Sequence, residues 1–369
     1  MLLTTGKISK RRLAKKTGIR NCPELAVVGE SLTRYRNGLC PYLHFLGSRT
    51  ISPMRKAFLL YNPLSGRGRG RRRADVEAAL SVLRAAGVEA LSAETRAAGD
   101  AKEQVGGALG SGFDTVFACG GDGTVHDVLQ GLVGTNAVLG IIPLGTANSL
   151  AHDLRLPLSP AGAARAALMG RRRRIAVGRI EYQSFAVGRA SRYFTVTAGV
   201  GVDAQLFYRL NPAAKRHLGM MAYYVKATRL WLTHKMQPFE IEVEVAGGDP
   251  ARRAEVSQLL AVRIQDFGGV LRELAPGASL ERDDLRLVLF HTRSRVSYLR
   301  YVARGLLGTK WRVPGIELLH SSGAVCRSLG PGSGTGSQVF VEADGELLGT
   351  LPAEIGVVPD ALSLLVPSG

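Results

Sequence analysis

The sequence lacks several features that would place it in a protein class at once. Its four cysteines, at positions 22, 40, 119 and 326, do not have the paired spacing of a disulfide framework or a zinc site, so a reducing cytosol is the default compartment. No run of 18 apolar residues occurs, and a membrane-spanning helix is therefore not predicted. The motif G-x-x-x-x-G-K-[ST] is also missing, which excludes a Walker-type phosphate loop.

Acidic residues are scarce relative to basic ones. The 369 residues include 48 Lys and Arg against 30 Asp and Glu, which gives a formal net charge of +18. This excess favours a polyanionic partner, either nucleic acid or an acidic membrane surface. Nucleic acid is the weaker interpretation, because no aromatic and basic recognition motif is visible.

Residues 1–53 form a separate basic segment. They hold ten Lys or Arg against two Glu and have no periodic apolar pattern. Three interpretations compete: a disordered basic arm that could hold the protein on anionic lipid, an organelle targeting segment, and a translation start placed too far upstream. The last is favoured, because Met54 directly precedes a clean strand pattern.

From residue 54 onward, short apolar segments alternate with turns and helical patterns. Strands are predicted at 57–61, 88–94, 115–119 and 138–142. Repeated βα units are typical of a parallel, doubly wound sheet, whose ligands bind beyond the carboxyl ends of the strands. Three glycine-bearing junctions fall at that edge: NPLSG (62–66), GGDGT (120–124) and PLGTAN (143–148).

The GGDGT junction contains a carboxylate where a phosphate site is expected. Its glycines allow a close approach of the backbone, and the helix that follows offers free N–H groups and a partial positive charge. Asp122 would repel a phosphate, so we expect its carboxylate to face a metal, a hydroxyl group or only water. A plain tight turn is the alternative interpretation of this loop alone.

Strand patterns dominate after about residue 174. Several segments with period-2 alternation predict an antiparallel sandwich or barrel, interrupted by helices at about 212–236 and 294–308. We therefore predict an α/β domain at 54–173 and a β-rich domain at 174–354. The strand-like residues 355–369 could return to the first domain.

Five segments, in this order, resemble the diacylglycerol kinase catalytic family, in its soluble bacterial lipid-kinase branch, which includes the sphingosine-kinase type. They are NPLSG, GGDGT, PLGTAN, AGVGVDA (198–204) and DGELLG (344–349), and the resemblance runs from about Lys56 to Pro367. GGDGT alone is shared with the NAD kinases, whereas the ordered set is specific to the lipid kinases. The resemblance implies a doubly wound α/β nucleotide domain, a second antiparallel β-sandwich domain that binds lipid, and an active site in the cleft between them.

The resemblance also implies ligands and residue roles. ATP and Mg²⁺ would be the cofactors, and a lipid alcohol of the diacylglycerol or sphingoid type would be the acceptor. The residues implied at the nucleotide are Asn62, Thr95, Gly120, Gly121, Asp122, Gly123, Thr124, Val125, His126 and Thr146. From the residues alone, Thr95 could be a simple loop threonine, and His126 and His152 are better explained as helix-surface histidines.

Phosphoryl transfer to an alcohol needs a carboxylate that receives the proton of the hydroxyl group. The resemblance places Asp344 and Glu346 opposite the glycine loop, and it places Asp122 with Mg²⁺. We favour Asp344 as the base, because a short side chain on a glycine turn is tightly positioned, with Glu346 as the alternative. The alternative is a hairpin turn whose acidic side chains are exposed and have no catalytic role.

A second, structural magnesium site is implied in the segment LERDDLRL (280–287). Asp283 would be the side-chain ligand, and Leu280 and Leu285 would offer backbone carbonyl groups, which suit a hard cation. Asp284 replaces the glycine that the family has in this segment, which puts the turn geometry in question. A solvated acidic loop is the alternative.

The predicted protein is cytoplasmic and contacts an anionic membrane surface peripherally. Helix 212–236 could lie at the interface or pack on the sandwich, and the arginines at 67–73 and 171–174 could bind ATP phosphates, face anionic lipid or be solvated. Two other functions stay open: an NAD kinase-like enzyme, and a membrane-associated lipid-binding protein without catalysis. The second rests on departures from the family pattern at Ser149, Asp127 and Asp284. The sequence does not predict an oligomeric state.

Overall fold

The structure is a computed structural model that divides the chain into two units, Met1–Arg49 and Thr50–Gly369. It describes residues 54–63, 69–96, 99–186, 188–202, 204, 236–244, 251–268, 273–309, 311–329 and 338–368, all of them in the second unit. The predictions for residues 1–53 and for nearly all of the helix at 212–236 lie outside these residues.

The first part of the second unit is a parallel sheet with the strand order β2-β1-β3-β4. Its strands are β1 (Lys56–Tyr61), β2 (Glu89–Glu94), β3 (Thr115–Gly120) and β4 (Val138–Pro143). Its helical elements are η2 (Arg69–Arg71), α2 (Arg72–Ala85), α3 (Ala101–Gly110), α4 (Asp122–Leu132), α5 (Ser149–Asp153) and α6 (Pro160–Met169). The predicted βα alternation is confirmed, and α6 is an additional helix.

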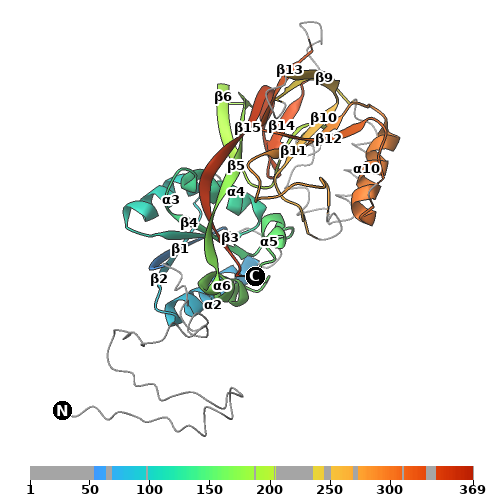
Figure 1. The fold of residues 1–369 in the computed structure, drawn as a ribbon. Helices are drawn as coiled ribbons and strands as arrows, with labels where there is room; N and C mark the ends of the chain where they lie inside the picture. The colour runs from blue at the N-terminus through green and yellow to red at the C-terminus, as the bar shows by residue number, and fades with distance from the viewer. Residues whose placement is uncertain are drawn as a thin grey trace, which may run out of the picture. The chain divides into compact units, whose positions relative to one another are not determined.

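Helices cover both faces of this sheet, as Figure 1 shows. Helices α2 and α6 pack on one face, in the core that contains Leu80 and Ala164. Helices α3 and α4 pack on the other face, in the core that contains Val105 and Leu129. The strands between the two cores are buried throughout in β3 and β4, which explains their continuous apolar sequences.

The described residues after α6 are mainly antiparallel strands, with the helix α10 (Arg295–Leu307) among them. The strands are β5 (Arg171–Ser184), β6 (Gly188–Phe194), β7 (Thr197–Gly201), β8 (Phe239–Val243), β9 (Arg252–Val256), β10 (Gln258–Val262), β11 (Leu285–Phe290), β12 (Ile316–Ser321), β13 (Gly323–Ser328), β14 (Phe340–Ala343) and β15 (Glu346–Val366). Strands β10, β11, β7 and β14 contribute to one buried core together with β5, β8, β13 and β15. The predicted sandwich is thus confirmed.

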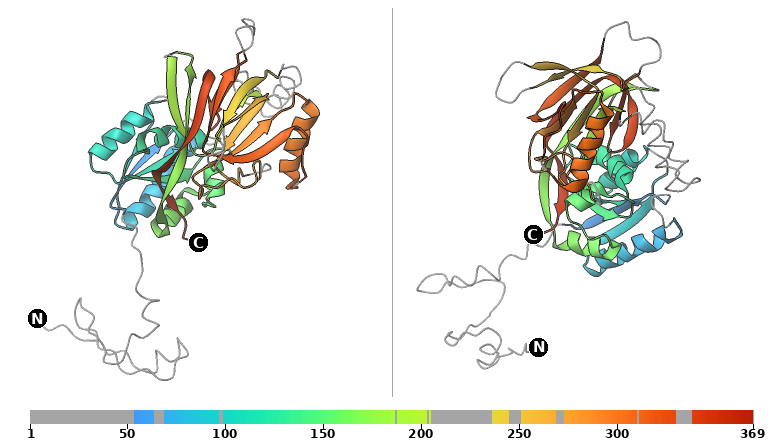
Figure 2. Two further views of the ribbon diagram at one scale, coloured as in Figure 1. Left: turned by 45° about the horizontal axis from the view of Figure 1, so that its top comes forward. Right: turned by 90° about the vertical axis from the view of Figure 1, so that its right-hand side faces the viewer.

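One long strand, β15, connects the two parts. It pairs with β5 from Gly349 to Val366, and its other edge meets β14, then β13, then β4 in turn. The last pairing is parallel and joins Ser363 to Val138. Figure 2 shows β5 and β15 running side by side between the parallel sheet and the sandwich. The boundaries predicted at 173/174 and 354/355 therefore fall inside β5 and β15, and the two parts are joined by hydrogen-bonded strands at these points.

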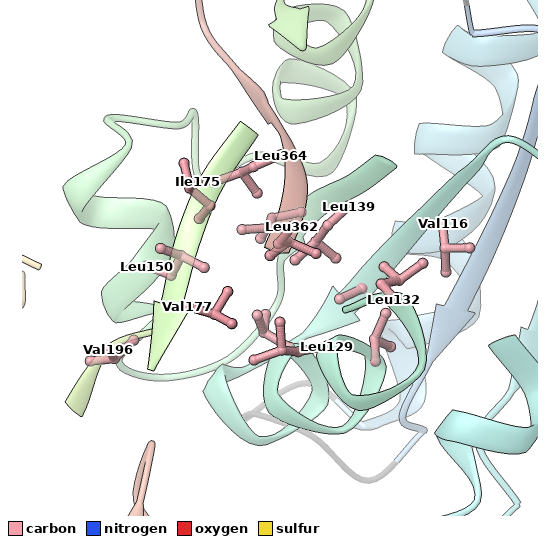
Figure 3. Close-up of a cluster of buried hydrophobic side chains, with 14 of the residues drawn as sticks. Val116, Leu129, Leu132, Leu139, Leu150, Ile175, Val177, Val196, Leu362 and Leu364 are labelled. Atoms are coloured by element: carbon pink, nitrogen blue, oxygen red, sulfur yellow. The ribbon is translucent and has the colours of Figure 1, made fainter. Parts of the chain in front are cut away.

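A buried cluster fills the junction between the two parts. Figure 3 shows Leu129 and Leu132 of α4 with Leu139 of β4, Ile175 and Val177 of β5, and Leu362 and Leu364 of β15. Helix α4 thus packs on both the parallel sheet and the β5–β15 pair. Among the helices of the described residues, none is long and apolar enough to cross a membrane.

Candidate active site

Four predicted nucleotide-binding segments lie at one edge of the parallel sheet. The strand registers align Tyr61 with Glu94 and with Cys119, and Gly120 with Pro143, so all four strands end side by side. The first residues beyond these ends are Asn62, Thr95, Gly121 and Leu144, and the predicted residue Thr146 follows in an exposed loop. The backbone N–H of Thr95 donates to Tyr61 at 2.9 Å, which places it next to the end of β1.

The two glycine turns after β3 and β4 contact each other through their backbones. A β-carbon on Gly145 would lie 2.3 Å from the Cα atom of Gly121, so no side chain fits between the turns. A β-carbon on Gly120 would lie 2.2 Å from the hydroxyl oxygen of Thr124, which folds back over the strand end. Gly121 and Gly145 are therefore needed for the contact between the two loops, and Gly120 is needed for the fold of its own turn.

Asp122 has a partner that the sequence did not suggest. Its Oδ1 atom accepts a hydrogen bond of 2.6 Å from the backbone N–H of Ser149, at the start of α5. The expectation of a metal, a hydroxyl group or water stays a prediction, and it missed this backbone N–H, through which the carboxylate joins the two glycine turns. Burial raises the pKa of Asp122, the Ser149 N–H opposes this rise, and the carboxylate of Asp344 adds to it.

Asp344 and Gly345 form the two-residue turn between β14 and β15. Both have positive φ angles, 49° and 83°, as the mirror-image turns of tight hairpins require, and Asp-Gly is a preferred sequence for them. The Asp344 side chain is buried and accepts hydrogen bonds from the backbone N–H groups of Thr195, Val196 and Thr197, at 2.9 to 3.1 Å. The hairpin turn is present, as the interpretation without a catalytic role expected. Its Asp344 side chain, however, is buried and not exposed.

His126 lies inside the protein, so the interpretation of a helix-surface histidine was wrong. The residue is 2% exposed, and its Nδ1 atom lies 3.4 Å from Oδ2 of Asp344. One turn further along α4, the amide of Gln130 accepts from the N–H of Tyr193 and donates to the carbonyl oxygen of Tyr193. Gln130 was missed from the sequence, although its i+4 spacing from His126 places both on one helix face. Together these residues fix α4 against the strands of the sandwich.

Glu346, the first residue of β15, lies against the first turn of α4. A β-carbon on Gly123 would lie 2.9 Å from Oε1 of Glu346. One side of Glu346 is open to solvent, but the protein on its other side desolvates the carboxyl and raises its pKa. His126 opposes this rise, and the carboxylates of Asp127 and Asp344 add to it. The predicted juxtaposition of the DGE turn and the glycine loop is therefore present in the structure.

The segment expected to hold a structural magnesium ion is bound by a buried cation of the protein itself, the side chain of Arg263. The guanidinium group of Arg263 donates to the backbone carbonyl oxygens of Arg282 and Asp284, at 2.7 and 2.5 Å, and to that of Ala176 at 2.8 Å. Burial lowers the pKa of Arg263 to about 10, while Asp284 and Asp283 act in the opposite direction. The group therefore stays charged at neutral pH.

The predicted ligands do not fit a metal ion well in this setting. Asp283 is exposed, and Leu285 lies in β11, where it pairs with Ser321, while Leu280 is buried in the core. A divalent cation at the carbonyl groups of this loop would be repelled by the charge of Arg263. No group of three or more His, Cys, Asp or Glu side chains placed to hold a metal ion occurs in the described ranges. Arg263 binds the carbonyl groups of Arg282 and Asp284 rather than those of Leu280 and Leu285, so the magnesium site stays a prediction, which the charge of Arg263 disfavours.

Asp284, which occupies the expected glycine position, is accommodated without strain. It does not have a positive φ angle, so a glycine is not required there. Its carboxylate pairs with Arg282 and, at 3.2 Å, with Nδ1 of His320. These contacts fix the outer side of the loop, and Arg263 fixes its inner side.

The arginine run at 171–174 binds the protein itself. Arg172 donates to the hydroxyl of Ser363 at 3.0 Å, and Arg174 pairs with Asp360 at 2.9 Å. Arg173 pairs with Glu281 at 2.8 Å. Arg172 and Arg174 are exposed as well, which agrees with a solvated run, and the binding of ATP phosphates or lipid by this run stays a prediction.

Comparison with known proteins connects this geometry to a family. Residues 56–180 match the model described as the diacylglycerol kinase catalytic domain, and residues 195–366 match the YegS C-terminal NAD kinase beta sandwich-like domain. The chain is 31% identical over 316 residues to a diacylglycerol kinase of Mycobacterium tuberculosis strain CDC 1551, an alignment that covers 85% of this chain and 95% of the relative. A diacylglycerol kinase of Bacillus subtilis strain 168 is 30% identical over 258 residues, 69% of this chain and 80% of the relative.

A solved structure has the same fold. The crystal structure of a diacylglycerol kinase from Bacillus anthracis strain Sterne superposes with a TM-score of 0.61, and the match covers 85% of this chain and 98% of that one. At 17% sequence identity, this similarity concerns the fold alone.

The role of Arg263 can be tested by unfolding. We expect Arg263→Met to lower the free energy of unfolding by about 3 kcal/mol or more, because three carbonyl groups lose a charged donor. The measurement is urea denaturation followed by circular dichroism, with and without EDTA, and the wild-type midpoint should not change with the chelator.

Arg282→Met is the matched control for this substitution. Arg282 belongs to the loop that Arg263 binds but its side chain is exposed, so its loss should leave the urea midpoint nearly unchanged. A wild-type midpoint that falls in EDTA and recovers with Mg²⁺ would contradict the assignment.

Proposed function

Because the chain belongs to the diacylglycerol kinase family and is a lipid kinase, we propose that it transfers the γ-phosphoryl group of ATP to the hydroxyl group of a diacylglycerol-type lipid. The observation that carries this proposal is the position of Glu346. Its carboxylate lies against Gly123 in the first turn of α4. This turn is part of the glycine-rich segment that follows β3. A proton acceptor and a phosphate-binding backbone thus face the same point.

The nucleotide is proposed to bind at the edge formed by the four strand ends. Gly121 is the N-cap residue of α4. The first turn of the helix presents backbone N–H groups without helical partners, which suits a phosphate group. Thr95, Asn62 and the exposed Thr146 flank this turn on the neighbouring strand ends. Most of the rate acceleration would come from the positioning of the reactants and from the neutralisation of their charge.

Glu346, rather than Asp344, is the better candidate for the base. A carboxylate has about four acceptor positions, and Asp344 uses three of them for backbone N–H groups while His126 faces the fourth side. Glu346 is open to solvent on one side, and its raised pKa brings it closer to the operating pH of a general base. The short, tightly positioned side chain that favoured Asp344 in the sequence is better suited to holding the turn.

Asp344 and His126 are proposed as positioning residues. Asp344 fixes the hairpin on which Glu346 stands by binding three consecutive residues, 195 to 197. His126 connects the same carboxylate to α4, whose first turn is the proposed phosphate site. The base and the phosphate site are therefore held by one group of contacts.

Magnesium is proposed to accompany the nucleotide, with Asp122 as the protein residue that fits it. Asp122 uses its Oδ1 atom for Ser149 and retains a second carboxylate oxygen. Mg²⁺ is commonly held by one or two carboxylates together with substrate phosphates, whose charge it neutralises. Such a role needs an ionised Asp122, and its raised pKa implies that binding weakens as the pH falls.

An assay of acceptors tests the proposal against the two other functions. Radiolabelled ATP is offered with diacylglycerol, a sphingoid base and NAD in mixed micelles, and we expect label in the lipid phosphate formed from diacylglycerol. Label in NAD alone would contradict the proposal, as would ATP binding without transfer to any acceptor. The second result would favour the lipid-binding protein without catalysis.

Substitutions separate the roles of the two acids on the hairpin. We expect Glu346→Gln to lower kcat by about 10²- to 10⁴-fold, the range of general-base catalysis, and to leave ATP binding and stability nearly unchanged. Asp344→Asn should instead lower the free energy of unfolding by about 1–3 kcal/mol, because its amide group faces N–H donors. Kinetics, isothermal titration with ATP and urea denaturation measure these effects.

The pH dependence of kcat provides a control for the same residue. The base must be ionised, so activity should fall on the acid side at a pH above the usual pKa of glutamate, because the pKa of Glu346 is raised. This acid limb should disappear from the residual activity of Glu346→Gln. If Asp344→Asn loses activity while its stability is intact, the assignment of the base must be reversed.

The fit between α4 and Glu346 predicts that Gly123→Ala is less active but stable. The new β-carbon would meet the Glu346 carboxylate, a flexible end that can move away, while alanine in a helix is more favourable than glycine by up to about 1 kcal/mol. We expect kcat to fall by about 10- to 100-fold, since small misplacements of a reacting group are costly.

Gly106→Ala is the matched control for Gly123→Ala. Gly106 lies in the interior of α3, and a β-carbon there would meet nothing within 4 Å. It should gain the same helical stability and keep full activity. Wild-type kcat in Gly123→Ala would show that the observed position of Glu346 has no part in catalysis.

A further inference from the structure

Helix α10 presents an apolar face to solvent. Ten large hydrophobic side chains are exposed among the described residues, and six of them lie between positions 296 and 311. They are Val296, Leu299, Val302, Leu306, Leu307 and Trp311, with exposed fractions from 41% for Val302 to 66% for Leu307. Spacings of three and four residues place Val296, Leu299, Val302 and Leu306 along one side of the helix.

The opposite side of α10 is firmly attached to the sandwich. The rings of Tyr298 and Tyr301 pack on Phe290 of β11, with centroid distances of 4.4 and 5.2 Å. The hydroxyl groups of Tyr298 and Ser257 are hydrogen-bonded at 2.8 Å, and the guanidinium group of Arg304 lies 4.5 Å from the Tyr301 ring centroid. The buried side of α10 thus carries two aromatic rings and Arg304, whereas an ordinary surface helix would not also carry large apolar side chains on its outer side.

The sequence around this face is basic, although one of its arginines, Arg293, pairs with Glu255 at 2.8 Å. Residues 285–316 contain no Asp or Glu, and the stretch from 293 to 312 contains five Arg and one Lys. Arg293, Arg295, Arg300 and Arg312 are exposed. An apolar surface bordered by basic side chains and followed by a tryptophan is the pattern of a helix that lies in a membrane interface.

We propose that the exposed face of α10 docks on an anionic lipid bilayer, with the helix in the plane of the membrane. A second copy of the chain suits this face less well, because it would bring two basic and apolar surfaces together without an acidic partner. The helix has 13 residues, about 20 Å in length, so it can lie in the interface but cannot span the bilayer.

This surface deepens the proposed function, since it would bring the enzyme to the phase in which a diacylglycerol substrate dissolves. Its physical basis, however, is the composition of the face and not the chemistry of the active site. Binding to vesicles that contain no substrate therefore tests it independently of any kinase activity.

The test is sedimentation of the full chain with sucrose-loaded vesicles of phosphatidylcholine containing 30% phosphatidylglycerol. We expect binding that weakens with salt and on pure phosphatidylcholine, and at least a tenfold lower partition coefficient for the double variant Leu299→Gln, Leu306→Gln. Leu91→Gln, Leu158→Gln is the matched control, because it removes two exposed leucines from the α/β part. This control should bind as the wild type does.

Fluorescence identifies the segment that enters the membrane. The chain has two tryptophans, so Trp231→Phe leaves Trp311 as the only one. Its emission should shift to the blue with anionic vesicles, and bromine-labelled lipid should quench it. Circular dichroism of each variant shows that the fold is kept.

Three results would overturn the proposal. They are wild-type protein that does not bind the anionic vesicles, a double variant that binds as tightly as the wild type, and a dimer in sedimentation velocity that the double variant dissociates. Vesicle binding through α10 without phosphorylation of any lipid would support this surface and contradict the proposed function. Phosphorylation of a water-soluble short-chain diacylglycerol without vesicle binding would support the proposed function and contradict this surface.

Discussion

The hydrogen bonds between β5 and β15 hold the parallel sheet and the sandwich in one continuous sheet. At one end of β15, Glu346 stands on the hairpin that the Asp344 carboxylate fixes, and near the other end Ser363 pairs with β4. Backbone pairing therefore fixes the position of Glu346, the first residue of β15, relative to the glycine turn after β3. The contacts of His126 and Gln130 along α4 strengthen this relation from the side.

Local patterns were enough to predict most of the fold. The βα alternation, the glycine turns and the Asp-Gly hairpin each arise from the conformational preferences of a few neighbouring residues, so the elements from β1 to β4 and the DGE turn follow from the sequence. The division into domains at fixed residues did not follow, because β5 and β15 each serve both parts. Strand pairing is a long-range property that periodicity does not contain.

The parts of the site that the sequence could not predict depend on distant partners. Nothing near His126 in the chain indicates burial beside Asp344, and nothing near Asp122 indicates the N–H of Ser149 as its partner. Arg263 is the clearest example, since one buried guanidinium group satisfies carbonyl oxygens from three separate residues. A family resemblance suggested a metal in that loop, and only the contacts revealed the arginine.

The position of β15 in the chain also constrains the order in which the protein can form during synthesis. The ribosome completes β4 more than 200 residues before it completes the strand that covers the edge of β4. Until then β4 has only β3 as a partner, and the β5 residues that pair with β15 have that edge uncovered. Exposed strand edges of this kind invite pairing with other chains. The nascent protein therefore depends on β15 to close both edges, and a ribosome that stalls before β15 is made would leave them open.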